Sequence, residues 1–266
     1  MFKRLLATLF AAGLSTSAVV SHATTVQFQT SLGEIEVVLF DQATPVTVAN
    51  FLDYVTSGAY QDTIVHRSIP NFVVQGGGFT LADEVTLKEI PKNDSVINEP
   101  YYSNVAGTIA MAKLGGQPDS ATSQWFFNVR DNSSALDYQN DGFTVFGQVT
   151  GEGMAVVNAI NAVKTYSSIP LQDYTDSDEN MPTEDNFIWV YGVTIIDADP
   201  NSADQLDELP PKIQPRSNAQ PQSKSGGALG LGALSTMLLA LLFARMLFAG
   251  ASRACVPSQD TDDFTR

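Results

Sequence analysis

The order of short apolar runs along the chain is the feature that most constrains its fold. Residues 26–29 and 34–39 alternate apolar and polar side chains, as half-buried strands do, on either side of a turn-like stretch. Six more runs of strand length follow, at residues 64–69, 72–75, 108–112, 125–129, 144–149 and 187–196. Short strands separated by turn residues favour a closed β-barrel.

Two segments have the apolar periodicity of a helix. In the first, Thr44 is the expected N-cap, Pro45 the first helical residue, and Gly58 ends the segment. The second covers residues 154–161. We therefore predict a mainly β fold whose barrel ends are capped.

Both ends of the chain differ from the middle. Residues 1–23 combine a basic start, an apolar run and a small-x-small ending, which is typical of a secretory signal peptide; a retained anchor is the alternative. Residues 24–198 form the predicted domain. Residues 199–225 are rich in Pro, Ser and Gln and predict a linker. Residues 226–250 are apolar enough for a C-terminal membrane helix, and residues 251–266 form a polar tail.

Ser225-Gly226-Gly227 before this apolar segment resembles the GlyGly-type C-terminal sorting signals of Gram-negative bacteria. The resemblance implies cleavage by a rhomboid-like protease and release of the exported protein to the cell surface. A plain C-terminal anchor that leaves the domain in the periplasm is the alternative.

The scarce residue types exclude several functions. The net charge is −15, and residues 24–200 hold six basic against 23 acidic residues, so nucleic acid is not an expected partner. One cysteine and two histidines exclude an internal disulfide and a Cys/His zinc site. Residues 76–78 are glycines but lack the Lys-Ser/Thr of a phosphate loop. We expect neither a metal nor a cofactor. The acidic stretch 173–185 is interpreted as a solvated loop, with a weak cation site as the alternative.

Four sequence blocks resemble the cyclophilin family of peptidyl-prolyl cis–trans isomerases, in particular its bacterial periplasmic branch. In chain order they read VHRSIPNFVVQGGGF, GTIAMA, SQWFF and TVFG, starting at residues 65, 107, 123 and 144. The resemblance runs over about residues 26–196 and implies an eight-stranded antiparallel closed barrel with an α-helix closing each end.

This activity needs little catalytic machinery. Rotation about an X-Pro bond has a barrier of about 20 kcal/mol because the amide C–N bond is partly double. A donor aimed at the prolyl nitrogen helps only in the twisted state, where conjugation is lost, and so stabilises the transition state. A thousandfold acceleration requires only about 4 kcal/mol.

By position in the family motif, Arg67 is that donor and Gln75 holds its guanidinium. The resemblance assigns substrate binding to Phe72, Val73, Ala112, Lys113, Gln124, Phe126, Leu136 and Phe143. An ordinary core role is the alternative for Phe126 and Leu136. Ala135 stands where many members carry Trp or Phe, so we expect a wider pocket and weak binding of cyclosporin. Trp125 replaces a Phe on a strand face expected to turn to the core.

The sequence therefore predicts a monomeric, exported isomerase of proline-containing polypeptides, held at the membrane by its C-terminal helix before any processing. A peptide-binding chaperone or scaffold that uses the same groove without catalysis is the alternative. A hydrolase is excluded because no Gly-x-Ser-x-Gly motif is present.

Overall fold

A computed structural model describes residues 24–175, 182–198, 206 and 208–214. The main sheet has nine strands in the order β3-β13-β1-β2-β10-β8-β9-β5-β4, and every neighbouring pair is antiparallel. The strands are β1 (Thr25–Thr30), β2 (Gly33–Leu39), β3 (Thr63–Ile64), β4 (Arg67–Ile69), β5 (Val73–Gly76), β8 (Thr108–Met111), β9 (Trp125–Asn128), β10 (Val145–Thr150) and β13 (Trp189–Asp197). Two small hairpins join β6 (Phe79–Leu81) to β7 (Leu87–Glu89) and β11 (Thr165–Tyr166) to β12 (Ile169–Pro170).

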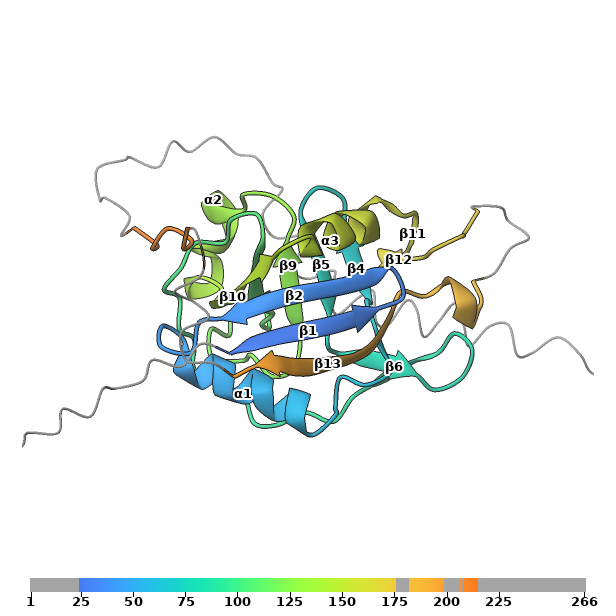
Figure 1. The fold of residues 1–266 in the computed structure, drawn as a ribbon, viewed down its shortest axis with the longest axis horizontal. Coiled ribbons are helices and arrows are strands. Elements are labelled where there is room, and N and C mark those ends of the chain that lie inside the picture. Colours follow the sequence, from blue (N-terminus) through green and yellow to red (C-terminus); the bar gives the residue numbers. More distant parts are fainter. Residues whose placement is uncertain (1–23, 176–181, 199–205, 207, 215–266) are drawn as a thin grey trace, which may run out of the picture.

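The sheet curls into a half-barrel whose two edge strands are close in the sequence (Figure 1). Only Val65 and His66 separate β3 from β4. The Val65 amide donates to the Ile188 carbonyl at 2.9 Å, whereas the His66 amide donates to the Gln75 carbonyl at 3.1 Å. The predicted single strand over residues 64–69 is therefore two strands, because its backbone changes partner between these two residues. The main sheet therefore has nine strands rather than the predicted eight.

Three α-helices and two 3₁₀ helices complete the described fold. α1 (Pro45–Thr56) and α3 (Gly153–Ala162) are the two predicted helices. α2 (Ser133–Leu136) and the 3₁₀ helices η1 (Gln139–Asp141) and η2 (Glu184–Asn186) are too short to give an apolar period. α1 packs near β13, and α3 packs on β2 and β10 (Figure 1).

The start of α1 is capped from a distance. Pro45 is its first residue as predicted, but the Thr44 side chain makes no capping hydrogen bond. Instead, the Glu99 carboxylate accepts from the Val46 amide at 3.3 Å and the Thr47 amide at 2.8 Å. A carboxylate at this end also favours the positive end of the helix dipole.

The larger apolar core fills the inside of the curled sheet. Phe28 lies edge-on to Trp125 and Phe127, with ring centroids 5.0 and 5.5 Å away, and all three are almost fully buried. The prediction that Trp125 faces the core is confirmed.

Part of the predicted linker lies against the domain. Lys212 forms an isolated β-bridge with Tyr102, and the Ser103 amide donates to the Pro211 carbonyl at 2.8 Å. The predicted signal segment, C-terminal apolar segment and polar tail lie outside the described residues. In the part of the chain that the structure covers, no helix is long and apolar enough to cross a membrane.

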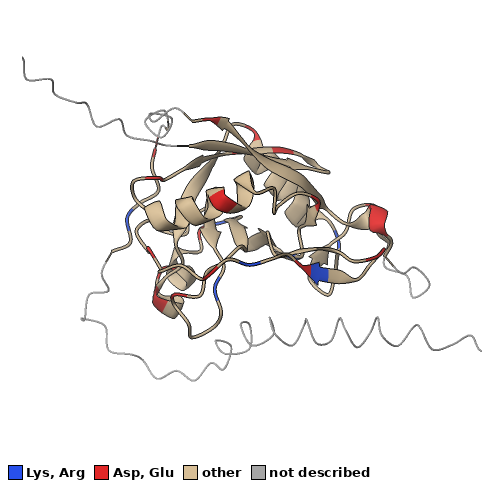
Figure 2. Cartoon of the chain, turned by 90° about the horizontal axis from the view of Figure 1, so that it is seen from below, with Lys and Arg blue, Asp and Glu red and all other residues tan. Residues whose placement is uncertain are grey.

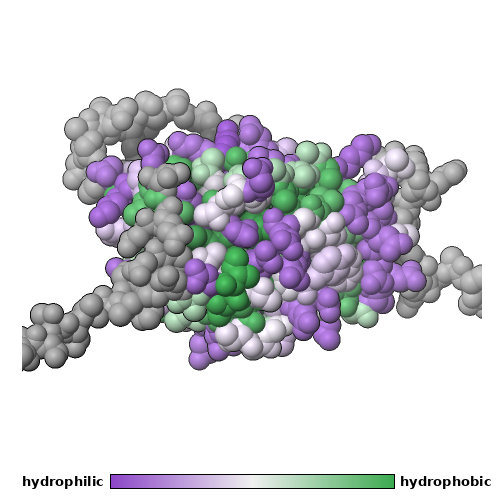
Figure 3. All heavy atoms as spheres, viewed as in Figure 1, coloured by the Kyte–Doolittle hydropathy of each residue, from purple (hydrophilic) through white to green (hydrophobic). Residues whose placement is uncertain are grey.

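The surface agrees with the charge count. Acidic residues are spread over several elements, and basic residues are few, in the cartoon of the chain (Figure 2). On the face that carries β1, β2 and β13, apolar areas are interrupted by polar ones (Figure 3).

Candidate active site

A second apolar cluster lies on the opposite side of the sheet from the main core. Neighbouring residues of β5 divide between the two, since Val74 packs in the main core and Val73 in the second cluster. In β9, Phe127 packs in the main core and Phe126 in the second cluster. This follows from strand geometry, because successive side chains point to opposite faces. The strands thus place apolar side chains in a second cluster outside the barrel core.

The second cluster contains most of the predicted substrate-binding residues. Leu136 of α2 and Phe143 join Val73 and Phe126 there, and Phe72 and Ala112 pack against them. The Phe126 and Phe143 rings meet edge-to-face with centroids 5.7 Å apart, and the Phe143 amide donates to the Leu136 carbonyl at 3.0 Å. Six of the residues that the resemblance assigned to substrate binding are therefore brought together.

A polar relay runs beside this cluster. Arg67 and Gln75 are paired in register across β4 and β5, and Arg67 Nη1 donates to Gln75 Oε1 at 3.1 Å. Gln75 Nε2 in turn donates to Gln124 Oε1 at 2.9 Å. Because Gln75 also pairs in register with Phe126, the relay and the apolar cluster adjoin.

Arg67 is held without an opposing charge. Within the described residues it forms no ion pair, and its side chain is only partly exposed. Burial lowers the pKa of the Arg67 guanidinium from its usual value, but a shift of this kind leaves arginine protonated. The chain thus presents a desolvated cationic donor whose identified hydrogen-bond partner is a neutral amide.

His66 precedes Arg67 and has a different setting. Its ring lies edge-on to Phe79 at 4.8 Å, and neither ring nitrogen has a partner in good hydrogen-bond geometry. Burial, helped by the Arg67 charge, lowers the pKa of His66 to about 3; Gln124 and the Ile64 backbone oppose this weakly. His66 is therefore neutral at physiological pH.

The three glycines at residues 76–78 make room for the relay. A Cβ on Gly76 would lie 2.5 Å from the Trp125 ring, and one on Gly78 would lie 2.7 Å from Gln124 Nε2. Gly77 has a φ of +74°, and its Cβ would lie 2.5 Å from Trp125 Nε1. These glycines are needed for close packing against Trp125 and Gln124.

A buried amide network supports the pocket from behind, and sequence reasoning missed it. Asn132 Nδ2 donates to the Phe72 carbonyl at 3.0 Å and to Asn128 Oδ1 at 2.8 Å. Asn104 Nδ2 donates to Asp137 Oδ1 and to the Phe143 carbonyl, each at 3.1 Å. The network therefore fixes the backbone of two pocket residues. A single sequence carries no clear signal for this network, because two of its acceptors are main-chain carbonyl groups.

The groove residues Ala112 and Lys113 differ in their roles. The Ala112 amide donates to the Gln124 carbonyl at 2.9 Å, so this amide does not face a substrate strand. The Lys113 side chain is almost buried, and its Nζ lies 5.0 Å from the centre of the Phe143 ring. All ten predicted site residues thus belong to one continuous region.

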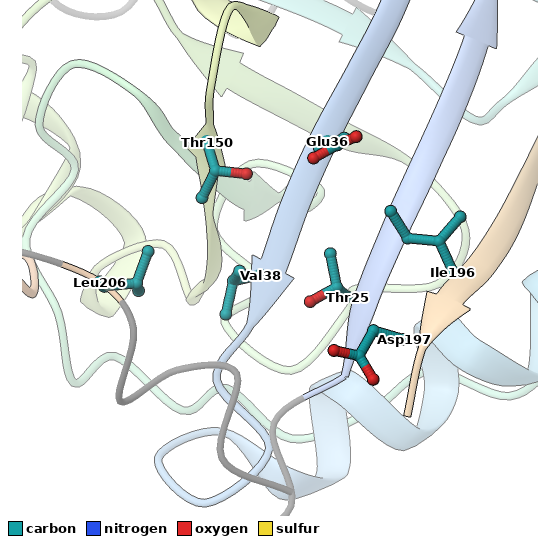
Figure 4. A pocket seen from close by; sticks show the side chains of 7 residues that line it. All are labelled: Thr25, Glu36, Val38, Thr150, Ile196, Asp197 and Leu206. Carbon is teal, nitrogen blue, oxygen red and sulfur yellow. The ribbon is translucent and has the colours of Figure 1, made fainter. Parts of the chain in front are cut away.

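Two other kinds of site were examined in the described part of the chain. It contains no group of three or more His, Cys, Asp or Glu side chains able to hold a metal ion. A separate hollow of about 320 Å³ lies over β1 and β2 beside the end of β13 (Figure 4). It is lined by Thr25, Glu36, Val38, Thr150, Ile196, Asp197 and Leu206, none of which belongs to the Arg67 relay.

The structure brings together an apolar cluster on a curled antiparallel sheet and one cationic donor beside it. Comparison with known proteins gives the family. The model of the family described as "Cyclophilin type peptidyl-prolyl cis-trans isomerase/CLD" matches residues 25–178. The chain is 43% identical over 180 residues to peptidyl-prolyl cis-trans isomerase A of Dickeya dadantii, covering 65% of this chain and 92% of that protein.

A second relative is peptidyl-prolyl cis-trans isomerase B of Escherichia coli. It is 41% identical over 159 residues, which cover 58% of this chain and 93% of that protein. A crystal structure of a cyclophilin type isomerase from Cryptosporidium parvum matches with a TM-score of 0.49 and 21% identity, covering 66% of this chain and 98% of that one. By the family model and the sequence relatives, this chain belongs to the cyclophilin family and is a peptidyl-prolyl cis–trans isomerase.

Proposed function

We propose that the chain accelerates rotation about X-Pro bonds in exported polypeptides, with Arg67 donating to the prolyl nitrogen in the twisted transition state. The observation that carries this proposal is the Arg67–Gln75 hydrogen bond beside the apolar cluster. Planar and twisted amides differ in the availability of the nitrogen lone pair. A fixed donor therefore favours the twisted form without needing a nucleophile or a general base.

The substrate proline would be held by the apolar cluster. In this proposal its ring packs against Phe126, Leu136 and Phe143, with Val73 and Phe72 as the remaining walls. Burial of the ring excludes water and strengthens the nearby Arg67 interaction. The backbone around Lys113 and the Gln124 side chain would bind the extended peptide on either side.

Activity of the purified full chain on a proline-containing peptide tests this function. We expect Arg67→Ala to lower kcat/KM by about 100-fold or more, as loss of a single transition-state donor does. Lys164→Ala is the matched control, since it removes an exposed positive charge elsewhere and should leave the rate unchanged. Equal rates for wild type and Arg67→Ala would exclude this mechanism.

The chaperone alternative has one observation in its favour. Ala135 is exposed next to the buried Leu136, so the rim of the pocket is open. Suppression of client aggregation that is equal in wild type and Arg67→Ala would show a binding function that is independent of catalysis.

We further propose that the protein acts in the periplasm as a monomer of the periplasmic branch, after removal of residues 1–23. Its C-terminal segment would anchor it or be cleaved by a rhomboid-like protease. The sequence patterns support this proposal, and both segments lie outside the described residues. Mass spectrometry of the mature chain tests it. A C-terminus near residues 226–227 would establish cleavage, whereas an intact Arg266 in the membrane fraction would establish the anchor.

We also infer that β3, Val65, His66 and β4 act as one bent strand that closes an eight-stranded barrel. The inference is supported by the amide hydrogen bonds of Val65 and His66, which continue the pairing from β13 to β5.

A further inference from the structure

The turn that leads into Phe143 has an unfavourable backbone. Asn140, Asp141 and Gly142 have φ values of +54°, +61° and +78°. L-residues rarely adopt this left-handed region; Asn and Asp do so more readily than most, at a cost that surrounding contacts must offset. Phe143, a wall of the proposed pocket, directly follows these residues and depends on them for its position.

Lys113 holds this turn from the side of the sheet. Its Nζ donates to the Asn140 carbonyl at 2.9 Å and also to the Gly142 carbonyl. In the opposite direction, Asn140 Nδ2 donates to the Leu114 carbonyl at 2.9 Å. The turn and the segment that follows β8 are therefore joined by hydrogen bonds in both directions.

Asn98 holds the same turn from another loop. Its Nδ2 donates to the Asp141 carbonyl at 2.8 Å and to the Gly142 carbonyl at 3.0 Å. Its Oδ1 accepts from Thr144 Oγ1 at 2.8 Å, on the other side of Phe143. Lys113 and Asn98 together bind all three carbonyl groups of the left-handed residues.

The Lys113 ammonium also contacts the pocket residue itself. Its Nζ lies 5.0 Å from the centre of the Phe143 ring, a distance suited to a cation–π interaction, and the side chain is only 5% exposed. Burial lowers the pKa of Lys113 to about 8, opposed by the charges of Asp141 and Asp119. The group is therefore mainly cationic at neutral pH, although it is almost enclosed by protein.

We propose that Lys113 is a positioning residue of the isomerase: its ammonium fixes the turn at residues 140–142 and thereby holds the Phe143 ring in the wall of the proline pocket. This inference rests on the pocket assigned under the proposed function. It gives the side chain a role that does not require contact with the substrate. Substrate affinity should depend on it more strongly than the rate of the bound complex.

The test is a double-mutant cycle on the full chain, with KM and kcat measured on one proline peptide. Lys113→Met keeps the apolar stem and removes the donors and the charge. We expect it to raise KM about tenfold while kcat stays within about twofold. In a Phe143→Ala background the same change should alter KM by less than about twofold, because the ring that it positions is gone. Lys88→Met, the same change at an exposed site, should be silent in both backgrounds.

The outcomes separate this inference from the proposed pocket. If Phe143→Ala raises KM but Lys113→Met does not, Lys113 has no positioning role. If Lys113→Met raises KM equally in both backgrounds, it acts through general structure, which also overturns the proposal. If Phe143→Ala leaves KM unchanged, the pocket assignment itself fails. Should Lys113→Met not fold, as judged by its thermal transition, Asn98→Ala loosens the same turn and replaces it in the cycle.

Discussion

Arg67 and Gln75 face each other across β4 and β5, and the hydrogen bond from Arg67 Nη1 to Gln75 Oε1 is 3.1 Å long. The two residues lie within a nine-residue stretch of sequence, yet the geometry of the bond depends on a residue beside a third strand. Gln124, next to β9, accepts from Gln75 Nε2 at 2.9 Å and so fixes which way the Gln75 amide points. The amide of Gln75 thereby presents its oxygen to Arg67.

This relationship predicts a graded loss of activity along the relay. Gln75→Leu removes the acceptor that orients Arg67, and we expect kcat/KM to fall about tenfold or more, with kcat carrying most of the loss. Gln124 is one hydrogen bond further from Arg67 than Gln75 is, so Gln124→Leu should lower kcat/KM less. Isomerisation rates of the two variants on one peptide check the order. The reverse order would show that Gln124 acts on the substrate rather than through Gln75.

The glycines behind the relay give a prediction about stability. Gly77 and Gly116 both have a φ of +74°, but a Cβ on Gly77 meets Trp125 and Ser123 within 2.7 Å, whereas nothing lies within 4 Å of one on Gly116. Gly116→Ala should therefore cost only the backbone strain, about 1 kcal/mol. Gly77→Ala should cost about 3 kcal/mol or more, because overpacking is added to strain.

Unfolding by denaturant measures the free energy of both glycine variants. Because Gly77 and Gly116 have the same φ, the difference between the two losses of unfolding free energy isolates the clash with Trp125 and Ser123. Equal losses of stability would mean that the Trp125 ring moves aside without cost.

The sequence predicts those parts of the fold that depend on local pattern. β5 and β9 are visible in the chain as short apolar runs. Because neighbouring residues of both runs are apolar, the assignment of Val73 and Phe126 to the pocket came from the family resemblance. The cap of α1 was not predictable in this way, because Glu99 lies 53 residues from the amide of Val46. The division of residues 64–69 between β3 and β4 likewise depends on which strands lie alongside.

The site was predicted less completely than the fold. The motif blocks contain seven of the ten residues, while Lys113, Leu136 and Phe143 lie outside them. The structure brings the ten together, but the residues that hold them in place also lie outside the blocks. Asn98 and Asn132 act on main-chain carbonyl groups of pocket segments. An amide side chain that binds backbone leaves no pattern in a single sequence, since its partner can be any residue type.

The buried His66 predicts a pH dependence of stability. Its pKa is lowered to about 3 in the folded state, against about 6.5 for an unperturbed histidine. Between these pH values the unfolded chain binds more protons, so stability rises with pH. This contribution is complete above pH 6.5 and is lost as the pH falls toward 3, by up to about 4 kcal/mol.

The pH dependence of stability measured for wild type and for His66→Gln separates the contribution of His66 from that of the carboxylates, because both chains have the same carboxylates. We expect the difference in the free energy of unfolding between wild type and His66→Gln to shift in favour of the variant as the pH falls from 7 to 4. A difference that stays constant over this range would show that His66 is not neutral in the folded protein at acidic pH. Activity should not follow this titration, because His66 does not change its charge in the folded state above about pH 4.

The open rim at Ala135 gives the last prediction. Ala135 is exposed on α2 beside Leu136, whose side chain is buried in the pocket cluster, and the family resemblance places Trp or Phe at this position in many members. A large ring here would add an apolar wall and a possible donor, so Ala135→Trp should strengthen the weak binding of cyclosporin about tenfold or more, equal to about 1.4 kcal/mol. Ser134→Trp places the same ring on the neighbouring exposed position and should leave the affinity unchanged. Isothermal titration calorimetry measures both; equal gains would mean that the added ring binds the ligand without completing this pocket.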